Sequence, residues 1–357
     1  MRTRTIRALL LAAVVAGSGV ANHAAGATVS WLSTSLATVT KDPATAALHP
    51  AWCCGGTLQT RWSYMEVSNA FDLTGITAML AVQKSNGMQN VILKIGSPPP
   101  DVNASNYVDR IKRLVAHMAA LFSTANDGLW ILPDNEPPIS RAGFDRHAAI
   151  LQACFQASHG RIKIVGCSLQ GVVPKWFAEL AKRGCAQWCD AIDFHYYGLW
   201  ASAPDVPWHN DGTGRTTLYD DLGAIRAMLP GKPFLCDEFG LCPSADRNEK
   251  TVLEMLAAGV NVIQPYLFEQ DMTVPGDDMS QYHGIYPYMF YRGWDKLNNR
   301  PAPYAQCVLD LAHQIGSNPK ASLTRSPDGR HVVSFTNGVT YTWNANRVAP
   351  IQRTTTP

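Results

Sequence analysis

Two glutamates have sequence contexts in which a carboxylate can do chemistry. Glu136 closes the segment Leu-Trp-Ile-Leu-Pro-Asp-Asn-Glu and is followed by Pro137, and Glu238 closes Pro-Phe-Leu-Cys-Asp-Glu before Phe239-Gly240. An apolar run that ends in an acid and a turn residue is how a buried parallel strand presents a carboxylate at the rim of an α/β barrel. Two carboxylates at one rim are the groups needed to cleave a glycosidic bond.

Neighbouring acids offer alternatives to these two. Each glutamate could instead be an exposed loop carboxylate, and Asp134 and Asp237 are competing candidates for the acid. Asp237 alternates out of phase with Glu238, so it should face the helices if Glu238 faces the barrel centre. Asp134 is in phase with Glu136 and should lie deeper in the barrel or at its rim.

The elements that must position these acids alternate along the chain from about residue 70. Helices are predicted over residues 74–86, 107–122, 144–157, 173–182, 218–228, 250–258 and 304–315, and strands over 91–95, 129–132, 162–165, 191–197, 233–238 and 261–268. The first two strands are placed near residues 28–31 and 57–64. This alternation predicts an α/β fold, a (β/α)8 TIM barrel. The G-x-G-x-x-G and Walker patterns of nucleotide-binding sheets are not found before any helix.

The C-terminal segment has a different pattern. Residues 331–335 and 339–343 are strand-like and flank Asn337-Gly338, which predicts a β-hairpin. A lone hairpin is marginally stable in water, so we expect it to pack on the side of the barrel. The predicted organisation is a signal peptide over 1–27, the catalytic barrel over 28–318, a hairpin extension over 319–350 and a disordered tail over 351–357.

The N-terminus is typical of a secretory signal. Three arginines precede an apolar stretch over residues 8–20, and Ala25-Gly26-Ala27 offers a cleavage site, with Gly19-Val20-Ala21 as a second candidate. An uncleaved N-terminal anchor is the alternative. No later segment is long and apolar enough to span a bilayer. We therefore expect a secreted or periplasmic protein.

Composition narrows the class of partner. The formal net charge is +2 without a basic run after the signal, which argues against nucleic-acid binding. Charged residues make up 16% of the chain, against about 25% in typical proteins. A weakly charged surface with ten Trp and twelve Tyr suits an uncharged, ring-shaped ligand such as a sugar, although cores also use aromatic residues. A monomer is expected.

Cysteines are the remaining compositional feature, nine in all. An exported chain should oxidise close pairs, and the odd count leaves at least one thiol unpaired. The close pairs are Cys53 with Cys54, Cys185 with Cys189, and Cys236 with Cys242. Their spacing does not match a zinc site. No metal or organic cofactor is expected.

Short motifs link this pattern to a known group of enzymes. Asn135-Glu136-Pro137, His195-Tyr196-Tyr197-Gly198 and Glu238-Phe239-Gly240 occur in this order at the ends of predicted strands. They resemble the N-E-P, H-x-Y-G and E-x-G motifs of the clan A glycoside hydrolases, retaining (β/α)8 enzymes that include families 5, 39 and 42. Residues 62–66 with Phe71-Asp72 resemble a stretch after strand two of the family 39 and 42 type. Residues 282–285 with 300–304 resemble the end-of-barrel pattern before the last helix. The resemblance covers about residues 57–315 and points to the clan without resolving the family.

The resemblance implies catalytic roles. Glu136 corresponds to the acid/base and Glu238 to the nucleophile, which in retaining enzymes lie about 5–5.5 Å apart. Glu136 should then have an apolar site that raises its pKa. Glu238 should have hydrogen-bond donors or a cation that keep it charged, and Tyr197 is a candidate donor. Asn135 could bind the 2-hydroxyl of the sugar.

His195 and the cation beside the nucleophile are open to more than one interpretation. His195 and Tyr197 are two apart on a strand and should share a face. His195 could instead be a buried core histidine, or with Asp193 a metal ligand pair that lacks an evident third member. Arg61 could be the arginine with which the clan holds its nucleophile, or a surface residue, and Lys94 is the alternative cation.

Aromatic platforms for sugar rings are expected at the ends of the strands and in the loops that follow. Some of these positions differ from the residues that the clan usually has there. Candidates are Trp200, Trp208 and, where the clan often has a tryptophan at the end of strand eight, Tyr266 or Phe268. Trp200 and Trp208 could instead cap the core. Asp134 stands where the clan usually has an aromatic residue before N-E-P.

These observations predict an exported, retaining glycoside hydrolase that uses double displacement on an oligo- or polysaccharide. The resemblance implies a β-linkage, and the lack of the large accessory domains common in exo-acting relatives favours endo action. The alternatives are a transglycosylase, a catalytically silent carbohydrate-binding barrel and a metal-dependent barrel hydrolase.

Overall fold

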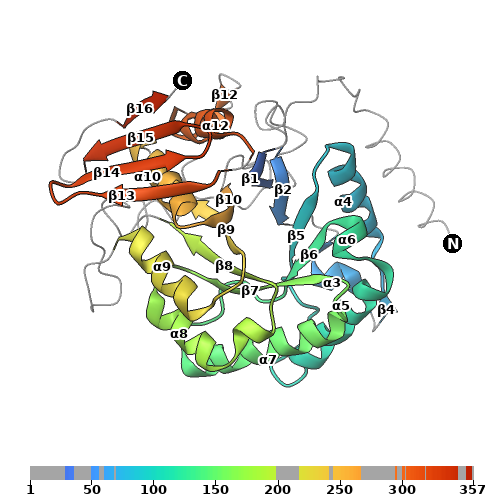
Figure 1. Cartoon of the computed structure of the whole chain (residues 1–357). Coiled ribbons are helices and arrows are strands. Elements are labelled where there is room, and N and C mark those ends of the chain that lie inside the picture. Colours follow the sequence, from blue (N-terminus) through green and yellow to red (C-terminus); the bar gives the residue numbers. More distant parts are fainter. Residues whose placement is uncertain are drawn as a thin grey trace.

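A computed structural model describes residues 29–35, 50–55, 60–67, 70–197, 217–240, 244–266, 294–295, 300–301, 303–317, 319–344 and 351–355. Eight parallel strands close into a barrel in the order β1-β10-β9-β8-β7-β6-β5-β2 (Figure 1). The strands are β1 (Val29–Ser35), β2 (Pro50–Gly55), β5 (Asn90–Lys94), β6 (Leu129–Leu132), β7 (Lys163–Leu169), β8 (Ala191–Tyr196), β9 (Phe234–Gly240) and β10 (Val260–Tyr266). The predicted TIM-barrel fold is confirmed.

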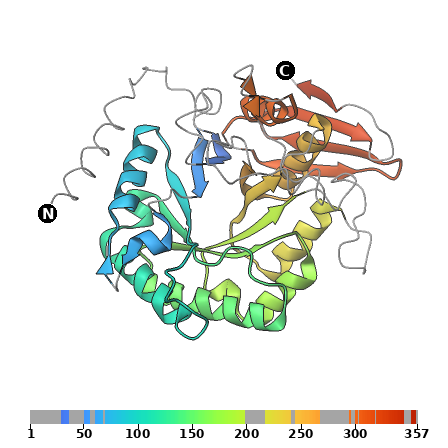
Figure 2. The same cartoon turned by 180° about the vertical axis from the view of Figure 1, so that it is seen from behind.

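Helices surround the barrel, as the two opposite views show (Figures 1 and 2). They are α4 (Thr74–Ser85), α5 (Tyr107–Leu121), α6 (Thr124–Asp127), α7 (Arg141–Ser158), α8 (Pro174–Lys182), α9 (Leu218–Met228), α10 (Ala245–Ala257) and α12 (Pro303–Ile315), with a short 3₁₀ turn at Cys185–Gln187. Two small hairpin-like pairs join β3 (Glu66–Val67) to β4 (Ala70–Phe71) and β11 (Trp294–Asp295) to β12 (Arg300–Pro301). None of the helices in the described part of the chain has the length and apolar character to cross a bilayer.

Two apolar layers hold the barrel together. Side chains of seven strands meet in the barrel interior, and a larger core lies between the strands and the helices. The interior layer consists of Cys54, Ile92, Leu132, Val165, Ala191, Leu235 and Val262. This layer fills the barrel below its C-terminal rim, so polar side chains further along the same strands are held at the mouth.

The second strand was predicted in the wrong place. It is β2 at Pro50–Gly55, whereas Trp62–Met65 forms the short helix α3. Trp62 and Met65 are both buried and three residues apart, which is the spacing of a helix face. The Trp62 N–H donates to the Gly96 carbonyl at 3.1 Å, which ties α3 to the end of β5.

Helix α10 begins five residues earlier than predicted. Ser244 caps it, because its hydroxyl accepts a hydrogen bond from the Arg247 N–H. The first turn after this cap contains Asp246, which pairs with Lys250 at 2.8 Å. A polar first turn with a side-chain cap does not show the apolar periodicity on which the prediction relied.

The C-terminal extension is a four-stranded antiparallel sheet rather than a lone hairpin. The predicted hairpin is present as β14 (Arg330–Phe335) and β15 (Val339–Asn344), with β13 (Ala321–Arg325) and β16 (Gln352–Thr355) added at its edges. Residues 352–355, expected to be disordered, thus form a strand. The sheet is fixed to two helices. The Tyr341 hydroxyl donates to Gln314 of α12 at 2.7 Å, and Arg325 pairs with Asp220 of α9 at 2.5 Å.

Candidate active site

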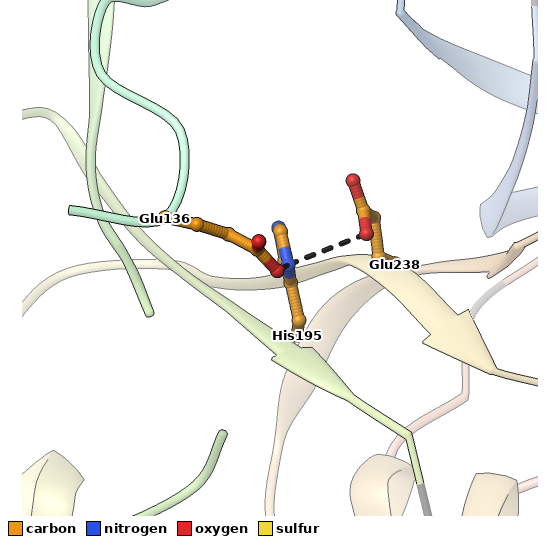
Figure 3. Close-up of side chains that lie close together, drawn as sticks. All are labelled: Glu136, His195 and Glu238. Carbon is orange, nitrogen blue, oxygen red and sulfur yellow. Dashed lines mark hydrogen bonds and ion pairs between the residues drawn. The ribbon is translucent and has the colours of Figure 1, made fainter. Parts of the chain in front are cut away.

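Glu136 and Glu238 meet at the C-terminal mouth of the barrel, on either side of His195 (Figure 3). Nδ1 of His195 lies 2.6 Å from a carboxylate oxygen of Glu136 and 3.3 Å from an oxygen of Glu238. One oxygen of each glutamate lies within 4.8 Å of the other and of the imidazole nitrogen. This proximity is compatible with the two carboxyl groups of a retaining glycosidase, which lie about 5–5.5 Å apart.

Glu136 is held in an unusual backbone conformation just beyond β6. Its φ is 50°, in the left-handed region that a non-glycine residue seldom adopts. The Glu136 N–H donates to the Ser168 carbonyl of β7 at 3.1 Å, and Gln170 lies 3.5 Å from the carboxylate. The Glu136 side chain is 32% exposed, so it can be reached from the barrel mouth.

Glu238 is the more enclosed carboxylate, with 8% of the residue exposed. The ammonium of Lys94, at the end of β5, lies 2.5 Å from one oxygen, and the hydroxyl of Tyr197 donates to the other. The predicted need for a donor and a cation is met by these two residues. These two contacts hold the carboxylate in one orientation, which is what a nucleophile requires.

Arg61 does not supply that cation. It precedes α3 with an exposed side chain, whereas the ammonium of Lys94 lies 2.5 Å from Glu238. The sequence suggested both residues as the cation beside Glu238 but could not decide between them, because the decision depends on how α3 and β5 lie in the folded chain. Lys94 is favoured by being the last residue of a strand whose neighbours meet at the same rim.

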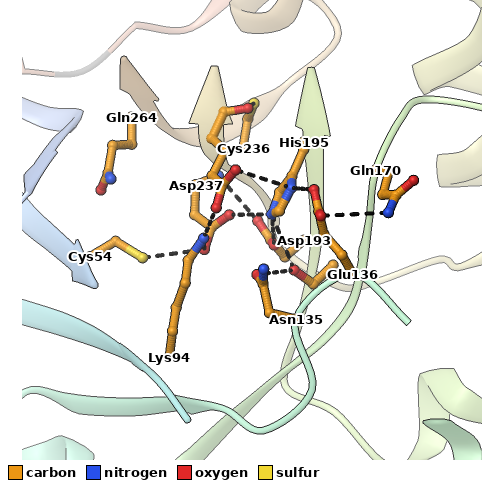
Figure 4. A network of polar contacts seen from close by, with 12 residues as sticks. Cys54, Lys94, Asn135, Glu136, Gln170, Asp193, His195, Cys236, Asp237 and Gln264 are labelled. Atoms are coloured by element: carbon orange, nitrogen blue, oxygen red, sulfur yellow. Dashed lines mark hydrogen bonds and ion pairs between the residues drawn. The ribbon is translucent and has the colours of Figure 1, made fainter. Parts of the chain in front are cut away.

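Asp237 faces the barrel interior, which contradicts the prediction that it faces the helices. Its carboxylate lies 3.0 Å from Lys94, 3.1 Å from Nε2 of His195 and 3.2 Å from the Cys54 thiol (Figure 4). The reason is a β-bulge. Asp193 pairs with Leu235 and His195 with Glu238. Between these two pairs the chain advances three residues along β9 but only two along β8. The extra residue breaks the alternation, and consecutive acids both reach the mouth.

A buried charge network under the two glutamates sets the protonation of His195. Burial alone would lower the pKa of His195, but its hydrogen bonds to Asp237 and Glu136 and the nearby acids raise it to about 10. Burial acts to raise the pKa of Asp237, yet the charges of Lys94 and His195 lower it well below its usual range. Burial and the charge of Asp237 raise the pKa of Asp193 well above its usual value.

The pKa of Glu136 is lowered, not raised as the sequence led us to expect. Burial acts to raise it, but the hydrogen bond from His195 and the charges of His195 and Lys94 outweigh burial. The proton of the Glu136–His195 pair therefore lies on the imidazole. The sequence could not reveal this, because it did not predict that the histidine of β8 would lie within hydrogen-bond distance of Glu136.

Asp134 turns away from the barrel mouth, so it is not a competing acid. It is buried and pairs with Nδ1 of His147 at 2.9 Å and with Arg146 at 3.4 Å, both on α7. Asn135 stays at the mouth, where its side-chain oxygen accepts from the Ser168 hydroxyl at 3.3 Å. Neither His147 nor Ser168 was identified from the sequence, since their partners are distant in the chain.

The other predicted binding residues are aromatic residues whose side chains lie outside the described part of the chain. Trp200, Trp208 and Phe268 lie outside the described residues, as do residues 282–285 of the motif before the last helix. Tyr266 is the last residue of β10, and only its backbone is described.

Cysteines and possible metal ligands were also predicted from the sequence. Eight cysteines lie in the described residues and all are free thiols, so the bridges expected for Cys53 with Cys54 and for Cys185 with Cys189 are not formed, and Cys242 lies outside. Asp237 joins Asp193 and His195 to give three side chains close enough to share an ion. Lys94 already neutralises Asp237, and His195 is protonated, so this donor set is poorly suited to a cation.

The sequence matches no protein-family model and no curated protein. The fold, in contrast, matches solved structures. A family 39 glycoside hydrolase from Bacteroides cellulosilyticus WH2 superposes with a TM-score of 0.61 at 9% identity over 86% of this chain and 67% of that chain. A monomeric β-xylosidase from Caulobacter crescentus CB15 gives 0.55 at 16% identity, over 90% and 75% of the two chains. Xylanase B from Clostridium stercorarium F9 gives 0.50 at 10% identity, over 78% and 96%.

These neighbours are a family 39 glycoside hydrolase, a β-xylosidase and a xylanase, and this chain shares their fold. The resemblance inferred from short motifs is therefore confirmed for the fold, and the individual family stays unresolved. At identities of 9–16% the likeness concerns the fold, and the function has to be argued from the site itself.

Proposed function

We propose that the protein is a retaining glycoside hydrolase in which Glu238 is the nucleophile and Glu136 the acid/base. The observation that carries this proposal is the pair of carboxylates at the barrel mouth, within 4.8 Å of each other and in different surroundings. Glu238 is enclosed, ion-paired to Lys94 and held by Tyr197, whereas Glu136 is more exposed. Unequal environments for two nearby carboxylates are what acid and nucleophile roles require.

In the first step, an oxygen of Glu238 attacks the anomeric carbon of the bound sugar. The bond from that carbon to the leaving oxygen breaks, and Glu136 transfers its proton to the leaving oxygen. The product of this step is a glycosyl ester on Glu238. The Lys94 ammonium and the Tyr197 hydroxyl hold the carboxylate in place for the attack.

In the second step, Glu136 acts as a base. It takes a proton from a water molecule as the water oxygen attacks the anomeric carbon, and the ester bond to Glu238 breaks. The two displacements together retain the configuration of the anomeric carbon. A lowered pKa suits this step, because Glu136 must accept a proton in ionised form.

The first step needs the opposite protonation state of Glu136. Of the three residues at the centre of the site, Glu136 has the most exposed side chain, at 32%. A sugar seated over it removes water, and burial raises the pKa of a carboxyl group. The proton that His195 Nδ1 holds 2.6 Å away is then the nearest source for Glu136.

For the substrate, we propose a polysaccharide with β-linked, uncharged sugar units, cleaved within the chain outside the cell. The structures that share this fold include a β-xylosidase and a xylanase, which supports a β-linked substrate. The low content of charged residues, 16%, supports a neutral one. Export rests on the signal-like N-terminus.

The test is the release of reducing ends from a panel of plant, fungal and bacterial polysaccharides. The wild type is compared with Glu238→Gln and with Glu179→Gln, a control at a partly exposed glutamate of α8 whose carboxylate pairs with Lys182 and Arg183. Activity in the wild type and the Glu179 variant, with loss in Glu238→Gln, is the expected result. Equal activity in all three would exclude Glu238 as the nucleophile.

The same assay separates the alternatives. Products longer than the substrate at high acceptor concentration would identify a transglycosylase, and binding without products would identify a carbohydrate-binding barrel. Loss of activity with a chelator would favour a metal-dependent hydrolase over the proposed mechanism.

A further inference from the structure

A buried polar pair lies behind the acid/base, on the helix side of the barrel wall. Asp134, two residues before Glu136, accepts a hydrogen bond from Nδ1 of His147 on α7 at 2.9 Å. His147 is fully buried and Asp134 nearly so. Neither side chain reaches the barrel mouth, so neither takes part in the chemistry proposed above.

His147 uses its second ring nitrogen on the backbone of β7. The Cys167 N–H donates to Nε2 of His147 at 3.2 Å, which fixes the tautomer with the proton on Nδ1. Cys167 and the next residue, Ser168, both have positive φ angles, 74° and 22°. Two consecutive non-glycine residues in this region are strained and persist only when their surroundings hold them.

The strained turn in β7 is in direct contact with the acid/base. The Ser168 carbonyl accepts the Glu136 N–H at 3.1 Å, and Glu136 itself has a positive φ. The Ser168 hydroxyl lies 3.3 Å from Asn135 and 3.3 Å from Nε2 of His195. One turn therefore determines the position of the Glu136 backbone and contacts the histidine that holds its carboxylate.

We propose that the Asp134–His147 pair positions the acid/base, by holding the strained Cys167–Ser168 turn against Glu136. The inference rests on the proposed role of Glu136. Asp134 anchors the strand end that precedes Glu136, and His147 anchors the strand end that accepts its N–H. The pair thus joins the segment after β6 to β7 from outside the barrel, at the level where Glu136, Cys167 and Ser168 have positive φ angles.

A positioning role of the Asp134–His147 pair has a different consequence from a purely structural one. A buried pair that only stabilised the fold would lower the activity on every substrate alike when it is lost. A pair that positions Glu136 should affect the steps in which Glu136 transfers a proton, and should have no further effect once Glu136 is removed. The second statement is a test of coupling between two residues.

The experiment uses His147→Leu, Glu136→Ala and the double variant, with kcat/KM measured on glycosides of one sugar that carry either a poor or an activated leaving group. Because kcat/KM reports on glycosylation, only the poor leaving group depends on protonation by Glu136. We expect His147→Leu to lose about 10- to 100-fold on the poor leaving group, the effect of a misplaced catalytic group, and far less on the activated one. In the Glu136→Ala background, His147→Leu should change neither value.

Two controls keep the result interpretable. Gln83→Leu also removes a buried polar side chain that hydrogen-bonds to the backbone: Gln83 donates to the carbonyl of Met88, which precedes β5 at the end of the barrel opposite its mouth. It should leave the ratio of the two substrates unchanged. If His147→Leu does not fold, Asp134→Asn keeps an oxygen that can accept from His147 and should shift the ratio in the same direction by a smaller factor.

Amide hydrogen exchange gives a readout that does not need turnover. The amides of Cys167 and Glu136 should exchange faster in His147→Leu than in the wild type, while Gln83→Leu leaves them unchanged. Faster exchange in a protein without glycosidase activity would support the positioning role and refute the proposed function. Unchanged exchange, equal losses on both leaving groups, or an undiminished loss in the Glu136→Ala background would overturn the inference.

Discussion

Replacing Lys94 with methionine removes the cation that the structure places between two acids. Its ammonium lies 2.5 Å from Glu238 and 3.0 Å from Asp237, and its side chain is 19% exposed. A single ion pair at such a site corresponds to about 4 kcal/mol at 4 Å and an effective dielectric constant of 20. Part of this is offset by the desolvation of Lys94. Breaking a buried pair by removing one partner costs about 3–5 kcal/mol, which is the loss of unfolding free energy that we expect.

Activity should fall with the same variant, because Glu238 loses the charge that holds its carboxylate for attack. A loss of about 3–4 kcal/mol in transition-state stabilisation corresponds to a decrease in kcat/KM of about 100- to 1,000-fold. The measurement is kcat/KM at neutral pH on the substrate that the polysaccharide panel identifies. Lys94→Arg keeps the charge and should retain more activity than Lys94→Met.

The pH dependence of the unfolding free energy gives a second test of the ion pair between Lys94 and Asp237. The charge of Lys94 lowers the pKa of Asp237, so the ionised Asp237 contributes stability above its unfolded-state pKa of about 3.9, which is lost only at more acidic pH. Without Lys94 the pKa of Asp237 rises, and the variant can take up a proton as the pH falls. Denaturation curves should therefore show the largest difference between wild type and variant at neutral pH and a smaller one toward pH 4.

Arg61→Met is the matched control for this experiment. Arg61 is the other cation that the sequence suggested for Glu238, but its side chain is exposed before α3. Its loss should change the unfolding free energy by less than about 0.5 kcal/mol, as is usual for an exposed residue. Wild-type activity and stability in Lys94→Met, or equal effects in the two variants, would refute the assignment of Lys94.

Three further outcomes are expected. Glu136→Ala should lower kcat/KM by about 100-fold or more on natural substrates and far less on activated aryl glycosides, since these need no protonation; steady-state kinetics on both would detect an equal loss, which would argue against the acid role. Tyr197→Phe should lower kcat/KM by about 10-fold through the lost hydrogen bond to Glu238, with no change in fold by circular dichroism; an unchanged rate would show that Tyr197 is dispensable. Glu249 is a carboxyl group whose pKa is raised to about 7 by burial and by the charge of Asp246, so its stability contribution is present below pH 4.5 and is lost as the pH rises through about 7. Glu249→Gln should therefore stabilise the protein at pH 8 by about 1–2 kcal/mol and have little effect at pH 4, as measured by thermal unfolding.

Much of the barrel could be predicted from sequence because each unit is a local pattern. The strand at Leu129–Leu132 and the helix at Leu218–Met228 have the predicted bounds, since an apolar run or an apolar stripe defines each of them. The second strand failed because Trp62 and Met65 lie in a short helix whose place depends on the Gly96 carbonyl, a contact to another unit.

In the candidate site, too, features of a single strand could be predicted, whereas contacts between strands could not. Glu136 and Glu238 could be found because Glu136 follows a buried strand and Glu238 lies near the end of one, and strand ends of a parallel barrel share one rim. The direction of the Asp237 side chain could not be predicted, because the alternation of apolar and polar residues in β8 and β9 does not reveal the bulge between them. The lowered pKa of Glu136 and the partner of Asp134 depend on His195 and His147, which contact them only in the folded chain.

The most direct test of the account is to trap the covalent intermediate. A 2-deoxy-2-fluoro glycoside with an activated leaving group, of the sugar that the panel identifies, slows hydrolysis of the ester, and peptide mass spectrometry locates the attached sugar. The account predicts one sugar on the peptide that contains Glu238, and none in Glu238→Gln. Attachment to Asp237 or Glu136, or turnover that inverts the anomeric configuration without any covalent species, would contradict it.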